Sequence, residues 1–371
     1  MTDLDERLRA ASRACTTSIV RGNPRTPAES FADLARACEE LGLDEWDMYG
    51  DGGAVARLEA EVAELLGKPA AVFFPSGVMG QQAALRSWCD RTGSLRVAIP
   101  DLSHLLVHEE DGPRLLHGFR FEHLTAGART PTAADLRALP AGLGAVLVEL
   151  PLREPGCLLP SWDELVELTE AAHGLDVPLH LDGARLWESQ PFYGRPHAEI
   201  AGLADSVYVS FYKGLAAAAG AAVAGPADLA DELRLWRRRM GGTLFRMAPY
   251  AVGALLGLRD HLPRMGDYAA WARALAAELT ALGLTVHPEP PHTNTFLVHL
   301  AFPAEAVNER LAEFMERTGI RLAGPFRDGA IPGWATTELA VQAAALDHDP
   351  GQVAAWWAEL LPTTSALLRS S

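Results

Sequence analysis

Short apolar segments alternate with helical patterns between residues 28 and 245, and this alternation limits the possible folds more than any other feature of the sequence. The helical patterns between the apolar segments include residues 55–66, 80–89 and 162–173. Strands that alternate with helices predict an α/β fold, with a mostly parallel sheet covered by helices on both faces. The expected strands are residues 70–74, 96–99, 145–150, 177–181, 206–210 and 221–224.

The pattern changes after the pair Gly241-Gly242. A long helix rich in alanine and leucine is expected over residues 250–282, followed by strands near 285–287 and 295–300. A helix over 304–317 and a closing helix from Pro350 complete a smaller α+β pattern. We therefore expect an N-terminal arm at residues 1–27, a large domain at 28–245 and a small C-terminal domain at 246–371.

The formal charge of the 371-residue chain is −16 at pH 7, and its pI is near 5.2. Such a field repels phosphates, so we expect neither a nucleic-acid partner nor binding to an anionic membrane. The sequence has no uninterrupted apolar run long enough to cross a bilayer, and its charged N-terminus does not resemble a signal peptide. Its four cysteines show no CxxC spacing, which favours reduced thiols and a cytoplasmic protein.

Only two of the 32 basic residues are lysines, Lys68 and Lys213. Arginine keeps its proton near neutral pH, whereas a buried lysine amine can lose it and attack a carbonyl group. Lys213 follows the carboxyl end of the predicted strand 206–210, whereas Lys68 lies in a segment typical of a solvated loop. Chance is the alternative explanation for a surviving lysine, but the position singles out Lys213 for amine chemistry.

Two other segments also follow predicted strands. The run Ser76-Gly77-Val78 leads from strand 70–74 directly into a helix, where backbone N–H groups can hold a phosphate; a simple N-cap is the alternative. Asp182 ends strand 177–181, at the edge where open α/β sheets bind their ligands, and Arg185 follows it. A carboxylate there can keep a pyridine nitrogen protonated, although a turn before Gly183 also explains an aspartate.

Together these segments supply a phosphate cradle, an acid for a pyridine nitrogen and an amine for a Schiff base. Those are the parts that a pyridoxal phosphate enzyme needs. Their order along the chain resembles that of the aspartate-aminotransferase-like class, fold type I. The glycine fingerprints of P-loop and dinucleotide-binding proteins are both missing, which makes a nucleotide-binding protein a poor alternative.

Over most of residues 45–300 the chain resembles the L-threonine aldolases and β-eliminating lyases. The segment HLDGAR, residues 180–185, is the most specific part of this resemblance. The other similar segments are residues 49–53, 75–77, 104–109 and 210–214. The resemblance implies a pyridoxal 5'-phosphate enzyme that cleaves a β-hydroxy-α-amino acid to glycine and an aldehyde.

The resemblance also implies roles for single residues. Lys213 would carry the cofactor as a Schiff base, and Asp182 would pair with the pyridine nitrogen. His104 would stack on the cofactor ring, and Arg185 would lie beside the ring oxygen and the substrate carboxylate. The residues that would hold the phosphate are Ser76, Gly77 and Val78.

Two of the similar segments have other interpretations. Without the resemblance, His104 would be read as an ordinary polar loop residue. With His108 and Glu109 it forms H-x-x-x-H-E rather than H-E-x-x-H, so we expect no catalytic zinc. The run 236–242 with Arg246 resembles a segment that reaches the neighbouring subunit's site, which implies a homodimer or homotetramer; a solvated helix face is the alternative.

The part of the sequence that would bind substrate departs from the family. The aldolases usually carry a histidine in the loop after strand 145–150, where this chain has Arg153 and Glu154. The family arginine that binds the substrate carboxylate is missing from residues 336–339. We therefore expect Arg185 or Arg153 to bind that carboxylate, with an ion pair to Glu154 as the alternative for Arg153. Threonine should then be a poor substrate.

Three functions stay open, in order of preference. The first is aldol cleavage of the Cα–Cβ bond. The second is β-elimination, in which Lys213 would remove the Cα proton and the products would be a keto acid and ammonia. The third is a regulator that binds pyridoxal phosphate without turnover.

Overall fold

The computed structural model describes residues 2–361, which form two units. One unit contains residues 28–263. The other contains residues 2–27 together with residues 264–361. The part of the chain before residue 28 therefore folds with the C-terminal part and not with the segment that directly follows it.

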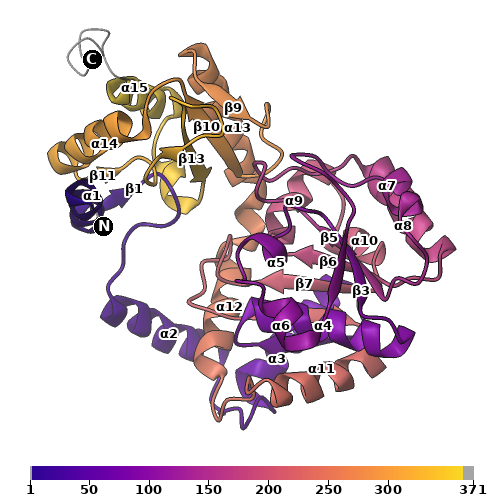
Figure 1. The fold of residues 1–371 in the computed structure, drawn as a ribbon. Coiled ribbons are helices and arrows are strands. Elements are labelled where there is room, and N and C mark those ends of the chain that lie inside the picture. Colours follow the sequence, from indigo (N-terminus) through magenta and orange to yellow (C-terminus); the bar gives the residue numbers. More distant parts are fainter. Residues whose placement is uncertain (1, 362–371) are drawn as a thin grey trace. The chain divides into compact units, whose positions relative to one another are not determined.

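The unit 28–263 is built on a seven-stranded sheet of order β2-β8-β7-β6-β5-β3-β4 (Figure 1). Neighbouring strands are parallel except where β8 lies between β2 and β7, antiparallel to both. The predicted mostly parallel sheet is thus confirmed. Its strands are β2 (Ala70–Phe74), β3 (Arg96–Ile99), β4 (Arg120–His123), β5 (Ala145–Glu149), β6 (Leu179–Gly183), β7 (Ser206–Ser210) and β8 (Ala221–Gly225).

Helices connect these strands and cover the sheet. Alternate residues such as Leu147 and Tyr208 belong to a buried cluster with α4 and α11, while their neighbours Val146 and Val209 are buried as well. Burial of both sets shows that both faces of the sheet are covered. The helices are α2 (Pro27–Leu41), α3 (Gly53–Leu65), α4 (Gly77–Thr92), α5 (His104–Val107), α6 (Gly112–His117), α7 (Ala133–Ala138), α8 (Trp162–Gly174), α9 (Leu186–Tyr193), α10 (His197–Gly202), α11 (Ala227–Arg239) and α12 (Ala248–Asp260).

Two strand predictions need correction. The strand expected at 177–181 is β6, and it starts at Leu179 because Pro178 has no N–H to donate to a neighbouring strand. It extends beyond Asp182, whose carbonyl accepts the N–H of Leu150 at 2.8 Å. The edge strand β4 was not expected, since only one of its four residues, Phe121, is apolar.

The long helix predicted over residues 250–282 is wrong. The structure has α12, a 3₁₀ turn at Leu262–Arg264 and then α13 (Met265–Ala281). Pro263 explains the break, because its ring clashes with the carbonyl of the preceding turn and it lacks the N–H that a continuing helix needs. The two units meet in sequence at this break.

The second unit contains a four-stranded antiparallel sheet of order β12-β13-β10-β9 and a short parallel pair, β1 with β11. Helices α1 and α14 pack on each other, as do α13 and α15. The elements not yet given are α1 (Asp3–Ala14), β1 (Thr17–Ser18), β9 (Thr285–His287), β10 (Thr295–Leu300), α14 (Ala304–Thr318), β11 (Ile320–Arg321), β12 (Arg327–Asp328), β13 (Ala335–Ala340), a 3₁₀ turn at Ala343–Asp347 and α15 (Pro350–Leu360).

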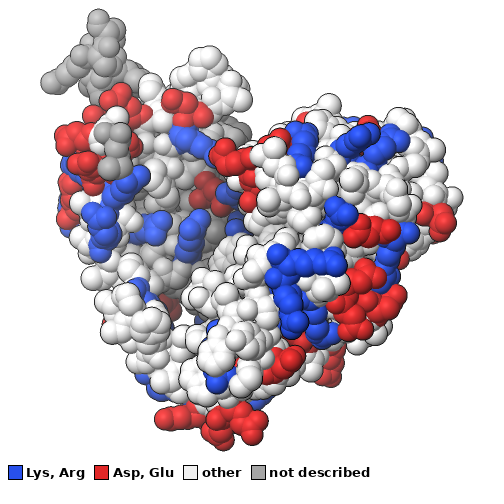
Figure 2. All heavy atoms as spheres, turned by 60° about the horizontal axis from the view of Figure 1, so that its bottom comes forward, with Lys and Arg blue, Asp and Glu red and all other residues white. Residues whose placement is uncertain are grey.

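Charged side chains of both signs lie next to one another on the face shown in Figure 2. Arg91, for example, pairs with Asp228 at 3.1 Å and with Glu232 at 2.9 Å. Such exposed pairs contribute little to stability individually. No helix within residues 2–361 is both long and apolar enough to cross a membrane.

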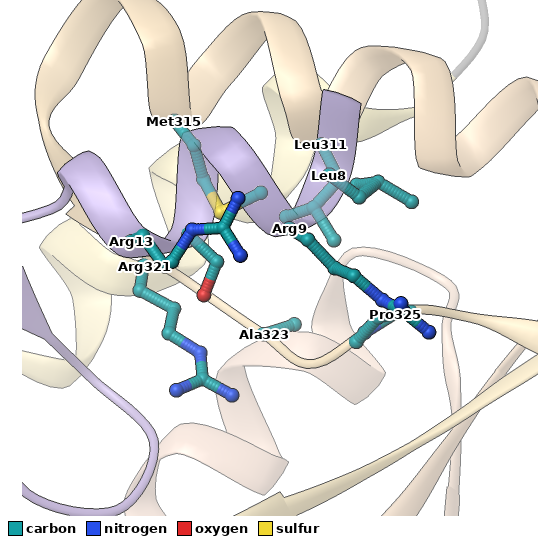
Figure 3. Close-up of a pocket in the computed structure, with 9 residues that line it drawn as sticks. Leu8, Arg9, Arg13, Leu311, Met315, Arg321, Ala323 and Pro325 are labelled. Atoms are coloured by element: carbon teal, nitrogen blue, oxygen red, sulfur yellow. The ribbon is translucent and has the colours of Figure 1, made fainter. Parts of the chain in front are cut away.

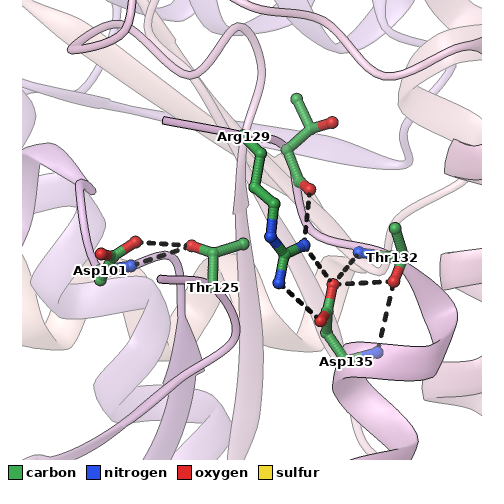
Figure 4. A network of polar contacts seen from close by, with 6 residues as sticks. Asp101, Thr125, Arg129, Thr132 and Asp135 are labelled. Atoms are coloured by element: carbon green, nitrogen blue, oxygen red, sulfur yellow. Dashed lines mark hydrogen bonds and ion pairs between the residues drawn. The ribbon is translucent and has the colours of Figure 1, made fainter. Parts of the chain in front are cut away.

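Polar contacts of Asp101 fix the loop between β3 and α5 (Figure 4). Asp101 accepts hydrogen bonds from the Thr125 hydroxyl at 2.7 Å and the Gly127 N–H at 2.8 Å. Both donors lie beyond β4, so these bonds tie the two loops together. His104 begins α5 three residues after Asp101, and its backbone is therefore held on this side as well. The loop after β4 continues to Arg129. The guanidinium of Arg129 forms an ion pair with the Asp135 carboxylate through two hydrogen bonds, at 2.7 and 2.8 Å.

We expect Gly257→Ala, in α12, to lower the free energy of unfolding by about 1–3 kcal/mol. A Cβ at Gly257 would lie 2.3 Å from the backbone oxygen of Leu215, in the turn that follows Lys213. In α13, a Cβ at Gly266 meets nothing within 4 Å, so Gly266→Ala should instead raise stability by about 0.5–1 kcal/mol. Urea unfolding of the two variants measures the difference, and equal midpoints would contradict the close approach of α12 to this turn.

Candidate active site

The carboxyl ends of the central strands meet at one edge of the large sheet. Glu149 of β5 is paired in register with Asp182 of β6, and Asp182 is paired with Tyr208 of β7. Lys213 follows β7 after a turn of two residues. A cavity opens at this edge, and the side chains of all four residues line it.

The cavity brings together seven of the eight residues singled out from the sequence. They are Gly77, Val78, His104, Arg153, Asp182, Arg185 and Lys213. Ser76 is the exception: it is exposed at the N-cap position of α4 and does not line the cavity. Its side chain makes no hydrogen bond to the helix end, so the simple N-cap interpretation has no support either.

The N-terminus of the 16-residue helix α4 faces this cavity through Gly77 and Val78. The first N–H groups of a helix have no partner within the helix and favour an anion. Gly77 is required here, because a Cβ would lie 2.0 Å from the Tyr208 hydroxyl oxygen. The contact between Tyr208 of β7 and Gly77 therefore leaves no room for a side chain at this helix end.

Asp182 and Glu149 form a buried pair of acids, at 2% and 4% exposure. Burial raises the pKa of Asp182 to about 8, with the charge of Glu149 adding to the effect. Glu149 accepts the backbone N–H groups of His104 at 2.9 Å and of Arg153 at 3.0 Å. Asp182 accepts the N–H of Ala184 at 3.1 Å and a hydrogen bond from Gln81. The hydrogen bonds to Asp182 do not offset its burial and the charge of Glu149, so a cationic ligand would stabilise the ionised form of Asp182.

Glu188 of α9 stabilises the turn that carries Lys213. Its carboxylate accepts the N–H of Gly214 at 2.9 Å, and Glu188 itself is buried. A side chain at position 214 would collide with this carboxylate, since a Cβ would lie 2.4 Å from its oxygen. The Lys213 amine lies 4.9 Å from the centre of the Tyr212 ring, at the wall of the cavity.

His104 lines the cavity, and another histidine and two acids surround it. The Nδ1 atom of His104 lies 3.1 Å from Glu109. Burial, together with nearby cationic groups, lowers the pKa of His104 to about 4, so its ring is neutral at pH 7. His108 Nε2 lies 2.6 Å from Glu154, and the guanidinium of Arg153 lies 3.0 Å from the same carboxylate oxygen.

The expected ion pair between Arg153 and Glu154 is therefore present, and Arg153 also lines the cavity. Arg185 is 8% exposed and stands at the start of α9. Within residues 2–361 no group of three or more histidine, cysteine, aspartate or glutamate side chains is arranged to hold a metal ion.

Four polar residues of the cavity wall were not singled out from the sequence: Gln81, Glu149, Tyr208 and Tyr212. Glu149 could have been found, because it lies at the carboxyl end of the predicted strand 145–150, just as Asp182 directly follows the predicted strand 177–181. Gln81 could not, since its place depends on how α4 is rotated over the sheet.

A second cavity, of about 290 Å³, lies in the other unit, between α1, α14 and the segment after β11 (Figure 3). It is lined by apolar side chains and by Arg9, Arg13 and Arg321. None of the residues predicted to be functional lies there.

Comparisons with known proteins place the chain in a family. The profile described as Beta-eliminating lyase matches residues 30–303. Low-specificity L-threonine aldolase 1 of Arabidopsis thaliana is 29% identical over 291 residues, which cover 74% of this chain and 80% of that protein.

Two solved structures are similar over nearly the whole chain. One, assigned as an L-allo-threonine aldolase of Listeria monocytogenes EGD-E, is 34% identical with a TM-score of 0.90, covering 96% of this chain and 100% of that one. The other, from Exiguobacterium sp. 255-15, is assigned as an aromatic amino acid beta-eliminating lyase/threonine aldolase. It is 38% identical with a TM-score of 0.89, covering 95% of this chain and 99% of that one. The predicted fold type I is confirmed, and the chain belongs to the beta-eliminating lyase family.

Proposed function

We propose that this chain is a pyridoxal 5'-phosphate-dependent lyase that cleaves the Cα–Cβ bond of a β-hydroxy-α-amino acid, giving glycine and an aldehyde. The observation that carries the proposal is the cavity in which Lys213, Asp182 and the N-terminus of α4 converge. The family supports a lyase that uses this cofactor. The names of similar proteins support the threonine-aldolase type of substrate.

The residues of the cavity fit the cofactor. Lys213 supplies the amine that would hold it covalently, and the N–H groups at Gly77 and Val78 would hold its phosphate, with Ser76 beside them. Asp182 would pair with its pyridine nitrogen, because it is a buried acid at the wall of the cavity that also holds Lys213. His104 would lie against its ring, since it is a neutral aromatic side chain at the wall of the same cavity.

When bound, the cofactor supplies an electron sink for the charge that develops at Cα. Asp182 keeps the proton on the ring nitrogen, which maintains the pull on those electrons. Glu109 orients His104 through Nδ1, which leaves Nε2 able to accept a proton from the substrate hydroxyl. The Lys213 amine, at the wall of the same cavity, could carry a proton near Cα.

Arg185 is our first choice for binding the substrate carboxylate, because a guanidinium binds a carboxylate through two hydrogen bonds. It is buried at the cavity wall, and its charge lowers the pKa of both Glu149 and Glu188, against the effect of their burial. Arg153 is the second choice, since its guanidinium already pairs with Glu154.

We also infer a homodimer or homotetramer and a cytoplasmic location. Exposed aromatic and apolar side chains lie close together around Asp47 and Arg246. These are Trp46, Met48, Tyr49 and Phe245, with exposed fractions of 50–63%. A surface of this kind suits contact with a second copy. None of the four cysteines, all of which lie within residues 2–361, forms a disulfide bond, which agrees with a reducing compartment.

The function is tested by incubating the enzyme with L-threonine, L-allo-threonine and β-phenylserine and identifying the products. Glycine and an aldehyde support the proposal. A keto acid with ammonia would replace it with β-elimination, and no product with cofactor bound would favour a binding protein.

Borohydride reduction of the cofactor-loaded protein should attach the cofactor to the peptide that contains Lys213. The reason is that Lys213 is the lysine of the cavity, whereas Lys68 donates to the backbone oxygen of Ala204 at 2.5 Å, elsewhere in the unit. Mass spectrometry of the digest locates the label. Lys213→Arg should lose the label and Lys68→Arg should keep it; the opposite result would rule out the assignment.

Asp182→Asn should change how the stability of the cofactor-free protein depends on pH. The folded-state pKa of Asp182 is raised from 3.8 to about 8, so the folded state binds its proton more tightly than the unfolded state. The contribution of this group to stability is therefore present at low pH and lost as pH rises through that window. The amide cannot ionise, so thermal midpoints should favour the variant increasingly from about pH 4 to pH 8. Saturating cofactor should reverse the order, and parallel curves without cofactor would contradict a buried ionisable carboxyl.

Arg185→Ala should lower kcat/KM for the best amino acid by roughly 10- to 100-fold, the effect of losing a hydrogen bond to a charged group. Arg153→Ala should have a smaller effect, because its ion pair with Glu154 is a loop contact. Steady-state kinetics of both variants on the same substrates give the comparison. A larger loss in Arg153→Ala would move the carboxylate site to the loop after β5.

A further inference from the structure

A chain of buried polar side chains runs from the interior of the large unit to Asp182. The Trp88 indole N–H donates to the Ser206 hydroxyl oxygen at 2.8 Å. The same oxygen lies 2.7 Å from His180 Nδ1, and His180 Nε2 lies 3.0 Å from the side-chain oxygen of Gln81. Gln81 in turn hydrogen-bonds to Asp182.

The geometry of the elements explains why these residues meet. Gln81 and Trp88 are seven residues apart on α4 and therefore lie on the same side of this helix. His180 and Asp182 are two residues apart on β6 and face the same side of the sheet. Ser206 of β7 is paired in register with His180. The chain is thus a product of how α4 lies across β6 and β7.

All five side chains are buried, with exposed fractions between 0 and 8%. Buried polar groups are costly unless every one of them is paired, and apolar residues would fill the same space at less risk. The need to fill space in the core therefore does not explain why a chain of polar side chains lies next to the proposed cofactor site.

The two ends of the chain fix the direction of its hydrogen bonds. The Trp88 indole can only donate, and an ionised Asp182 can only accept. One hydrogen per link is available if Ser206 donates to His180 Nδ1, His180 donates from Nε2 to the Gln81 oxygen, and the Gln81 amide donates to Asp182. In the reverse direction Gln81 would present its oxygen to a carboxylate. A neutral imidazole suits this arrangement, and burial lowers the pKa of His180 to about 3.

We propose that Gln81 and His180, supported by Ser206 and Trp88, form a positioning chain that holds the carboxylate of Asp182 ionised and oriented toward the ring nitrogen of the cofactor. The proposal rests on the proposed role of Asp182. None of the four supporting residues transfers a proton to the substrate; they act on the electron sink through Asp182.

The test uses Gln81→Leu and His180→Phe in the full-length enzyme, loaded with pyridoxal phosphate labelled with ¹⁵N in the ring. The ¹⁵N chemical shift reports directly whether the ring nitrogen is protonated. In both variants we expect protonation to be lost at a lower pH than in the native enzyme. Gln81→Leu should bind the cofactor roughly 10- to 100-fold more weakly, as expected when a charged group loses a hydrogen bond. It should lower kcat more than it changes KM.

Gln82→Leu is the matched control. Gln82 is the next residue of α4, is equally buried, and has a side-chain oxygen without a hydrogen-bond partner in the described structure. It should leave the ¹⁵N shift and cofactor affinity unchanged. Thermal midpoints of the cofactor-free proteins separate these effects from general destabilisation.

Trp88→Phe covers the case in which His180→Phe does not fold. A positioning chain predicts that its effect on the ¹⁵N shift is smaller than that of Gln81→Leu, because it lies three links farther from Asp182. If these residues only fill the core, Trp88→Phe should lower the thermal midpoint more than Gln81→Leu does, and neither variant should change the ¹⁵N shift.

Asp182→Asn separates the proposed role of Asp182 from the proposed positioning chain. If it leaves ring protonation unchanged, the proposed role of Asp182 fails. If it abolishes protonation while Gln81→Leu and His180→Phe behave like Gln82→Leu, the role of Asp182 stands and the positioning chain is overturned.

Discussion

The burial of two carboxylates side by side, Glu149 and Asp182, is the constraint on which the active site depends. Parallel strands place them in register at the same sheet edge, where each opposes ionisation of the other. Glu149 is offset by two backbone N–H groups, from His104 and Arg153. One buried acid therefore fixes the positions of two loops, and the other, Asp182, is the one that we propose to pair with the cofactor.

The carboxyl edge of the large sheet also explains why Lys213 and Asp182 line the same cavity. Strand β7 runs parallel to β6, so both end at the cavity, and β8 returns antiparallel through the Gly220 turn. The turn after β7 must be narrow, because Glu188 supports it on one side and Gly257 of α12 approaches on another. Two glycines and a buried acid thus hold the backbone of the turn and leave the lysine side chain directed to the cavity wall.

The sequence predicts the parts of this site that lie along strands. Apolar strands of the interior are visible as runs, and a polar residue at the end of such a run, such as Asp182, has a position that follows from the topology. The register across the sheet and the rotation of α4 are not visible, because they depend on contacts between distant segments. For that reason Gln81 and the chain through His180 were missed, although HLDGAR was recognised. The helix break at Pro263 was missed because the alanine- and leucine-rich pattern continues on both sides of it.

The division of the site between strands and loops has a consequence for specificity. Asp182, Tyr208 and the helix end at Gly77 are fixed by the sheet and by α4, so the cofactor side cannot move without disturbing the core. His104 and His108 bound the short helix α5 within the loop region after β3, and Arg153 lies in the loop after β5. The anchors of these loops are polar contacts to Glu149, Glu109 and Glu154. Substitutions in these loops can alter the shape and charge around the substrate's side chain while the electron sink stays intact. A chain that lacks the usual aldolase histidine after β5 can therefore keep the lyase chemistry and differ in the amino acid that it accepts.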